Sequence, residues 1–180
     1  MILKFKINTM LMVLLLSSFY GFSQDKKLDE ESKSKIVTAA KEIMMSAPTC
    51  TLITIDDQGR PRARAMDPFA PEDDFTIWLG TNPKSRKVGQ IKNDDRVTLY
   101  YLDHDDSGYV MIHGNAKIIE DQVEKEKHWK EEWKAFYPNK RDTFVLIKVT
   151  PEWLEVISNT RGILGNKDTW EPQKVIFESN

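Results

Sequence analysis

The chain has 180 residues and a formal net charge of -2, with 28 acidic and 26 basic side chains. This near-neutral balance provides no general attraction to nucleic acid or to an anionic membrane surface, so we expect neither as a partner of the mature protein. Cys50 is the only cysteine, which excludes an internal disulfide.

The N-terminal residues 1–23 have the pattern of a secretory signal peptide. Two lysines precede an apolar centre, and the small residues Gly21 and Ser23 suit cleavage before Gln24. The apolar run is shorter than the about 20 residues that cross a bilayer, so a retained anchor is the less favoured alternative. We therefore expect an exported protein, periplasmic or secreted after cleavage.

The rest of the chain is long enough for one domain with a proper core. Residues 24–46 form an N-terminal helical segment, in which apolar residues recur at helical spacing up to Pro48. Residues 47–180 form the main domain, and alternating patterns predict strands at 49–56, 60–67, 73–81, 96–103 and 108–120. One or two strands are expected in 143–157, a last strand at 174–177, and helices at 83–93 and 121–137.

Six or seven antiparallel strands with few helices indicate a mainly β fold. A closed or partly closed β-barrel with flanking helices is expected, because closure removes the exposed edges of so much sheet. We expect Cys50, which lies among β-forming residues, to be a small core residue.

The second strand carries Arg60, Arg62 and Arg64 at alternate positions, so the three share one face and Ala63 and Ala65 share the other. A solvated face with the alanines turned inward is one interpretation. The alternative is that the arginines serve an anion, and the next basic cluster favours it.

That cluster lies in the stretch GTNPKSRK, which follows the third strand. It combines Gly80, which has no Cβ, the hydroxyls of Thr81 and Ser85, and the cations Arg86 and Lys87 at the start of a helix. These are the components of a phosphate-binding site. If the strand ending at Arg64 lies beside the strand ending at Thr81, the two basic clusters converge.

The surrounding sequence resembles the pyridoxamine 5'-phosphate oxidase superfamily of FMN-binding split barrels. The shared motifs are G-x-P-x-x-R at 59–64 and TNxxSRKxxQIxxxxRVxLxY at 81–100. TPEWLEVI at 150–157 is most similar to the general stress protein 26 branch. The resemblance implies a homodimer of split barrels with FMN in a groove between the subunits.

The resemblance also implies roles for particular residues. The flavin phosphate would be held by Arg64, Arg86 and Lys87, with Ser85 beside them. Gly80 and Thr81 would approach the ring and the ribityl chain, and Ala65 and Met66 would run along the edge of the ring. Tyr109 stands where the oxidases place a glutamine against the flavin.

Two departures argue against oxidation of vitamin B6. Phe69 stands where the oxidases have a lysine that serves the substrate, and the C-terminus lacks their Arg-x-His pair. We therefore expect an FMN-dependent oxidoreductase that acts on a small molecule of unknown identity. The alternative is a non-catalytic cell-envelope protein that binds or sequesters flavin, haem or another phosphorylated flavin-like cofactor.

Other candidate sites are interpreted as structural, and no metal site is expected. The three histidines lack the spacing of a helical metal site, and the acidic loop at 103–106 is expected to be a solvated hairpin. The aromatic residues of 121–137 form a stripe that either packs over the open end of the barrel or forms a lid over a ligand. Trp153 and Trp170 either cover a planar ring across the dimer or pack within the chain.

Overall fold

The computed structural model describes residues 28–105, 107–139 and 143–178. The expected signal peptide at 1–23 therefore lies outside the described residues. Glu31–Asn180 form one compact unit, so the N-terminal helix belongs to the same unit as the strands. In the described part of the chain, no helix has the length and apolar character needed to span a bilayer.

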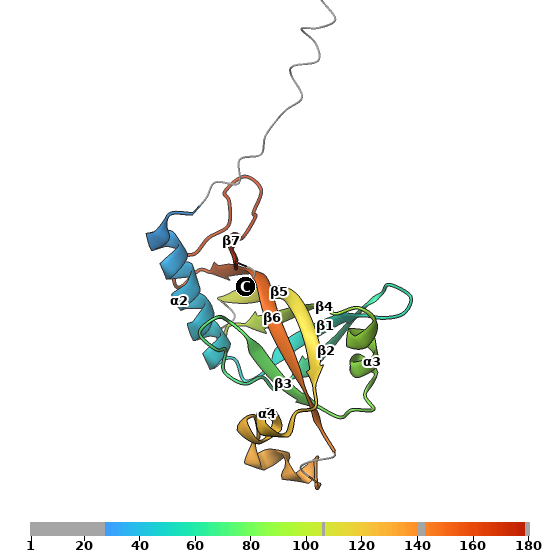
Figure 1. The fold of residues 1–180 in the computed structure, drawn as a ribbon. Helices are drawn as coiled ribbons and strands as arrows, with labels where there is room; N and C mark the ends of the chain where they lie inside the picture. Colours follow the sequence, from blue (N-terminus) through green and yellow to red (C-terminus); the bar gives the residue numbers. More distant parts are fainter. Residues whose placement is uncertain (1–27, 106, 140–142, 179–180) are drawn as a thin grey trace, which may run out of the picture. The chain divides into compact units, whose positions relative to one another are not determined.

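Seven antiparallel strands form the framework of this unit (Figure 1). The sheet order is β2-β1-β4-β5-β6-β3, and β7 pairs with β6 outside this path. The strands are β1 (Cys50–Ile55), β2 (Pro61–Met66), β3 (Ile77–Thr81), β4 (Arg96–Leu102), β5 (Gly108–Ile119), β6 (Val145–Ser158) and β7 (Gln173–Ile176). This is the expected mainly β architecture, consistent with a split barrel whose sheet is not closed.

The helices are α2 (Glu30–Ser46), α3 (Arg86–Asn93) and α4 (Gln122–Lys127), with a 3-10 helix, η1, at Glu131–Ala135. In Figure 1, α2 and α3 lie at opposite sides of the sheet. Helix α2 buries one apolar stripe, as its spacing predicted: Ile36, Ala39, Ala40, Ile43 and Met44.

The core lies on the inner face of the sheet, where alternate residues of each strand are buried. Leu52, Leu99, Ile112 and Leu154 all have 0% exposure and come from four successive strands of the sheet order. Cys50 is 3% exposed and belongs to this core, as expected.

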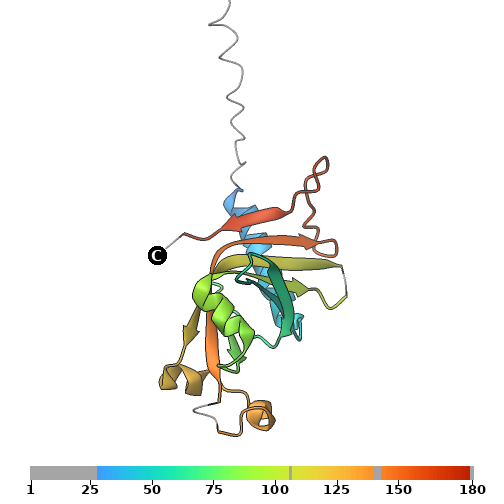
Figure 2. The same ribbon diagram turned by 90° about the vertical axis from the view of Figure 1, so that its right-hand side faces the viewer.

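The long strands β5 and β6 bend, and Figure 2 shows the course of β6 beside β7. Their register shifts between His113 and Gly114. A Cβ at residue 114 would lie 2.2 Å from the carbonyl oxygen of Thr150, so the close approach of the two backbones at this bulge requires glycine.

Two predicted elements were wrong in detail. The strand expected from residue 73 begins only at Ile77, because Phe75 has a φ of 63° and lies in a turn. The helix expected at 121–137 is broken into α4 and η1, and its aromatic stripe is not continuous. Val123 and Phe136 are 72% and 76% exposed, whereas Trp133 is buried.

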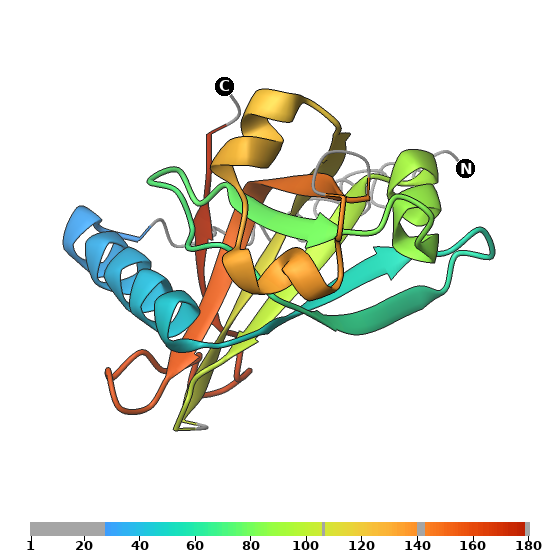
Figure 3. The same cartoon turned by 90° about the horizontal axis from the view of Figure 1, so that it is seen from below.

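The segment that contains α4 and η1 covers the outer face of β3 (Figure 3). Trp133 packs there in a cluster with Trp78, Phe144 and Leu146. Trp78 is therefore buried although it lies on the outer face of its strand, which simple alternation did not predict.

Candidate functional site

Arg64 lies on the inner face of β2 and reaches neutral acceptors on two other elements. Its Nη1 donates to Thr54 Oγ1 at 2.7 Å and to the carbonyl oxygen of Leu52 at 3.3 Å. Its Nη2 donates to Gln90 Oε1 on α3 at 3.0 Å, and Thr54 Oγ1 donates to the same oxygen at 2.7 Å. These bonds hold the guanidinium between β1 and α3.

Lys87 lies in the first turn of α3 and reaches back to the end of β3. Its Nζ donates to Thr81 Oγ1 at 3.0 Å, and Thr81 Oγ1 lies 3.2 Å from Ser85 Oγ. Ser85 is the N-cap of α3, but its side chain makes no capping hydrogen bond. The positive end of the helix dipole therefore adds to the neighbouring cations.

Strands β2 and β3, which were expected to lie side by side, are connected through the segment that follows β2. Strands β2 and β3 are the two ends of the sheet order, so they are not directly paired. However, Pro68, just after β2, forms a β-bridge with Leu79, and Phe69 N donates to the carbonyl oxygen of Trp78 at 3.0 Å. The chain that leaves β2 thus runs beside β3, which brings the two basic clusters together.

We call Arg64, Thr81, Ser85, Arg86 and Lys87 the basic site. Burial lowers the pKa of Arg64, and the charges of Arg62 and Arg86 lower it further. Burial also lowers the pKa of Lys87, with Arg64 as the second cause. Both pKa values fall because the cations lie close together in partly desolvated positions.

No carboxylate offsets these charges among the residues that the structure describes. The hydrogen-bond acceptors of Arg64 and Lys87 are hydroxyl, amide and carbonyl oxygens. An array of cations, hydroxyl groups and an uncapped helix start suits a phosphate, whose monoester carries about -1.5 to -2 charges near pH 7. The residues therefore fit the phosphate of the cofactor that the sequence motifs imply.

Arg60 is not part of the basic site. Arg60 is exposed, and its Nε donates to Asp56 Oδ2 at 3.1 Å in the turn before β2. The interpretation of a solvated face holds for Arg60 but not for Arg62 and Arg64, which are half-buried, and the alanines at 63 and 65 are exposed and not turned inward.

Ala65 and Tyr109 lie on the face of the sheet opposite the basic site, whereas Met66 shares the face of β2 that carries Arg64. Ala65 occupies the face of β2 opposite Arg64, and Met66 is buried opposite Cys50. Tyr109 lies on β5, where its ring stacks on Tyr100 with the centroids 5.2 Å apart. The strand register places Tyr109 on the same outer face as Ala65.

Gly80 contacts the protein's own aromatic cluster. A Cβ at residue 80 would lie 2.4 Å from Cη2 of Trp133, so the indole fills the space in front of this glycine. Trp133 Nε1 donates to Asp67 Oδ2 at 3.1 Å, and Lys130 Nζ donates to Asp67 Oδ1. The missing side chain at residue 80 therefore makes room for Trp133.

Sequence reasoning missed Thr54 and Gln90, which position Arg64, and Asp67, which holds Trp133. Gln90 had a usable signal, because it follows Arg86 and Lys87 at helical spacing and shares their face of α3. Asp67 had none, since its partners Lys130 and Trp133 are far away in the chain.

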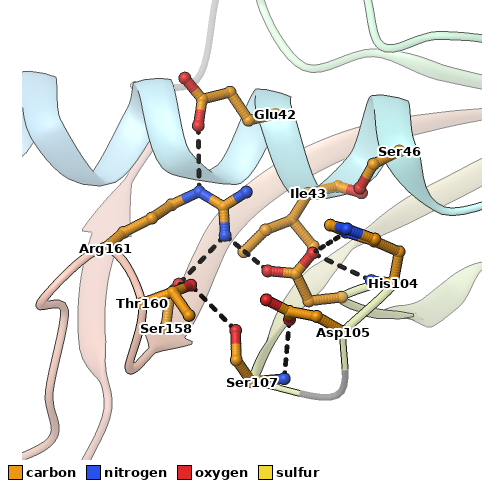
Figure 4. A network of polar contacts seen from close by, with 10 residues as sticks. Glu42, Ile43, Ser46, His104, Asp105, Ser107, Ser158, Thr160 and Arg161 are labelled. Atoms are coloured by element: carbon orange, nitrogen blue, oxygen red, sulfur yellow. Dashed lines mark hydrogen bonds and ion pairs between the residues drawn. The ribbon is translucent and has the colours of Figure 1, made fainter.

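The acidic hairpin is only partly solvated, and Figure 4 shows the polar contacts around it. His104 and Asp105 are exposed, but the side chain of Asp103 is completely buried and accepts a hydrogen bond from Arg161 Nη1 at 2.5 Å. Arg161 Nε donates to Glu42 Oε2 on α2 at 3.0 Å. This network joins α2 to the β4–β5 hairpin, so its role is structural.

The other histidines and tryptophans make mostly structural contacts. His128 is buried and stacks on Trp78 at 4.2 Å, and His113 stacks on Trp153 at 5.1 Å. Trp170 does not pack within the described chain, because it is 84% exposed.

Comparison with known proteins agrees with this geometry. The family model described as "Pyridoxamine 5'-phosphate oxidase like" matches residues 33–165. General stress protein 26 of Bacillus subtilis is 28% identical over 106 residues, which cover 56% of this chain and 74% of that protein.

Solved structures show the same fold. The crystal structure of general stress protein 26 from Bacillus anthracis is 26% identical, covers 80% of this chain and 97% of that chain, and has a TM-score of 0.61. A Clostridium acetobutylicum protein related to general stress protein 26 has a TM-score of 0.67 at 21% identity, and it covers 83% of this chain and 96% of that chain. The chain belongs to the pyridoxamine 5'-phosphate oxidase like family.

Proposed function

We propose that the protein binds FMN through the basic site and acts as a flavin-dependent oxidoreductase. The single observation that carries this proposal is the meeting of Arg64 with Arg86 and Lys87, without a carboxylate to neutralise them in the described residues. Arg64 and Lys87 are half-buried and Arg86 is exposed. Holding like charges together around the half-buried pair costs free energy, which an anionic ligand recovers. Membership of the family supports a flavin as that ligand.

The chain's own groups would bind and orient the cofactor. Arg64 and Lys87 would hold the phosphate by charge-assisted hydrogen bonds, and the start of α3 would add its backbone N–H groups. When bound, the flavin would supply the redox chemistry, while the protein supplies binding and electrostatic tuning. A second subunit would complete the groove in the proposed homodimer, and the sequence of residues 1–23 supports export of the protein.

The outer face of the sheet supports the homodimer. It presents Ala63 and Ala65 on β2, together with the half-buried rings of Tyr100 and Tyr109. Apolar and aromatic groups gathered on one sheet face are typical of a face that is covered in an assembly.

The test is to express the full chain, purify the protein and record its absorbance spectrum before and after addition of FMN. We expect the bound flavin to copurify or to be taken up in a one-to-one ratio per subunit. Addition of a reduced nicotinamide should then bleach the absorbance of the bound flavin. Bound flavin that a reduced nicotinamide does not bleach would favour a sequestering protein, and absence of flavin binding would refute the proposal.

A further inference from the structure

Arg62 lies beside the basic site, and its guanidinium has no bonding partner among the described residues. It lies on the same face of β2 as Arg64, opposite Thr54, which is completely buried. After burial, the charge of Arg62 is the largest cause that lowers the pKa of Arg64. Residues two apart on one face of a strand are separated by only about 6.5 Å along the chain, so the two guanidinium groups repel one another.

Arg62 differs from its neighbour Arg60 in its surroundings. Arg60 is exposed and paired with Asp56, with an Nε–Oδ2 distance of 3.1 Å. Arg62 is half-buried, and in the described parts of the chain no hydrogen bond or ion pair engages its guanidinium. A half-buried cation beside another cation is unfavourable unless an anion is present.

The number of charges exceeds what one phosphate monoester neutralises. Arg64, Arg86 and Lys87 supply three positive charges, and Arg62 makes a fourth. A phosphate monoester carries about -1.5 to -2 charges near pH 7, so about two positive charges remain. A second anionic group next to the phosphate would neutralise them.

We infer that the basic site extends along β2 to Arg62 and accepts, besides a phosphate monoester such as FMN, ligands that carry a phosphate and a second, adjacent anionic group. A diphosphate ester, such as that of a flavin dinucleotide, is the chemical class that fits. The phosphate-binding role of Arg64, Arg86 and Lys87 is the proposed function on which this inference rests. Arg62 is then the residue that separates diphosphate from monophosphate ligands.

The test compares inorganic phosphate with pyrophosphate by isothermal titration calorimetry on the full chain. The wild-type protein, Arg62→Gln and the matched control Arg60→Gln are titrated at low and at physiological ionic strength. We expect the wild type to bind pyrophosphate about tenfold or more tightly than phosphate, as one additional charge-assisted contact implies. Arg62→Gln should lose most of this preference for pyrophosphate, while its affinity for phosphate should stay within about threefold of the wild-type value. Arg60→Gln should preserve both affinities.

The outcomes separate the two proposals. If phosphate binds but the pyrophosphate ratio survives in Arg62→Gln, the inference is wrong and the phosphate site stands. Equal losses of pyrophosphate affinity in Arg60→Gln and Arg62→Gln would indicate that the positive charge of the whole surface attracts the anion. This result would also refute the inference. If neither these anions nor FMN binds the wild type, the proposed function itself fails. A parallel titration with FMN and FAD checks whether the preference extends to esters, and circular dichroism confirms that the variants are folded.

Discussion

The indole of Trp133 lies directly against Gly80, where a Cβ would be only 2.4 Å from Cη2. Trp133 is 7% exposed and is held by Asp67, the residue that follows β2. This contact joins the outer face of β3 to the η1 segment. It also explains why a residue without a Cβ suits the next-to-last position of β3.

Gly80→Ala should destabilise the protein, because the new methyl group overlaps the buried indole. We expect a loss of about 1–3 kcal/mol in the free energy of unfolding, measured by urea denaturation. Gly89→Ala is the matched control, since a Cβ there meets nothing within 4 Å and lies in α3. It should stabilise the protein by about 0.5–1 kcal/mol. Equal effects of the two substitutions would contradict the Gly80–Trp133 contact.

Arg64→Ala or Lys87→Ala should weaken FMN binding, because each removes a cation from the basic site. The expected loss is about 1.5–3 kcal/mol for each charged hydrogen bond, measured as the change in Kd by flavin fluorescence titration. Arg60→Ala should have little effect, because Arg60 is already paired with Asp56. A similar loss in all three variants would argue for a diffuse basic field and against a shaped site.

The pKa of Lys87 should lie below 10.5 and should rise toward that value in Arg64→Gln, because Arg64 is the second cause of its depression after burial. Between the lowered folded-state pKa and the unfolded-state value, the unfolded chain binds more protons. The contribution of Lys87 to stability therefore increases as the pH rises through that window. NMR titration of carbon-13-labelled lysine side chains measures the pKa, and Arg60→Gln should leave it unchanged.

Loss of Arg161 should destabilise the protein strongly, because it leaves the buried carboxylate of Asp103 without its cation. Arg161→Leu is expected to cost about 3–5 kcal/mol, measured by chemical denaturation. Glu42→Gln removes the exposed end of the same network and should cost at most about 1 kcal/mol. A large loss of stability in Glu42→Gln would show that the network stabilises the protein mainly by attaching α2, and not by neutralising the buried carboxylate of Asp103.

Cys50 should be inert in the folded protein, because burial raises the pKa of its thiol to about 12. Thiolate is the reactive form, so alkylation at mildly alkaline pH should be slow in the native state and fast in denaturant. The rate is followed by mass spectrometry after iodoacetamide treatment. Rapid modification of the native protein would contradict the buried position of this residue.

Local patterns predicted much of the fold because they depend on neighbours in the chain. Alternation located β1, β2, β4 and β5 to within a residue or two, and the apolar stripe located α2. The prediction of a single helix at 121–137 was wrong, because the apolar spacing continues past residues 128–130, where α4 has ended and η1 has not yet begun.

The sequence by itself determined the mainly β architecture, the family and the cations of the basic site, since periodicity and motif are local properties. Only the tertiary structure decided that Arg64 bonds Gln90, that Arg62 remains unpaired in the described chain, and that Trp133 occupies the space at Gly80. These outcomes depend on how strand register and side-chain packing join segments far apart in the chain. Such contacts are set by the geometry of the whole sheet, which no short stretch of sequence encodes.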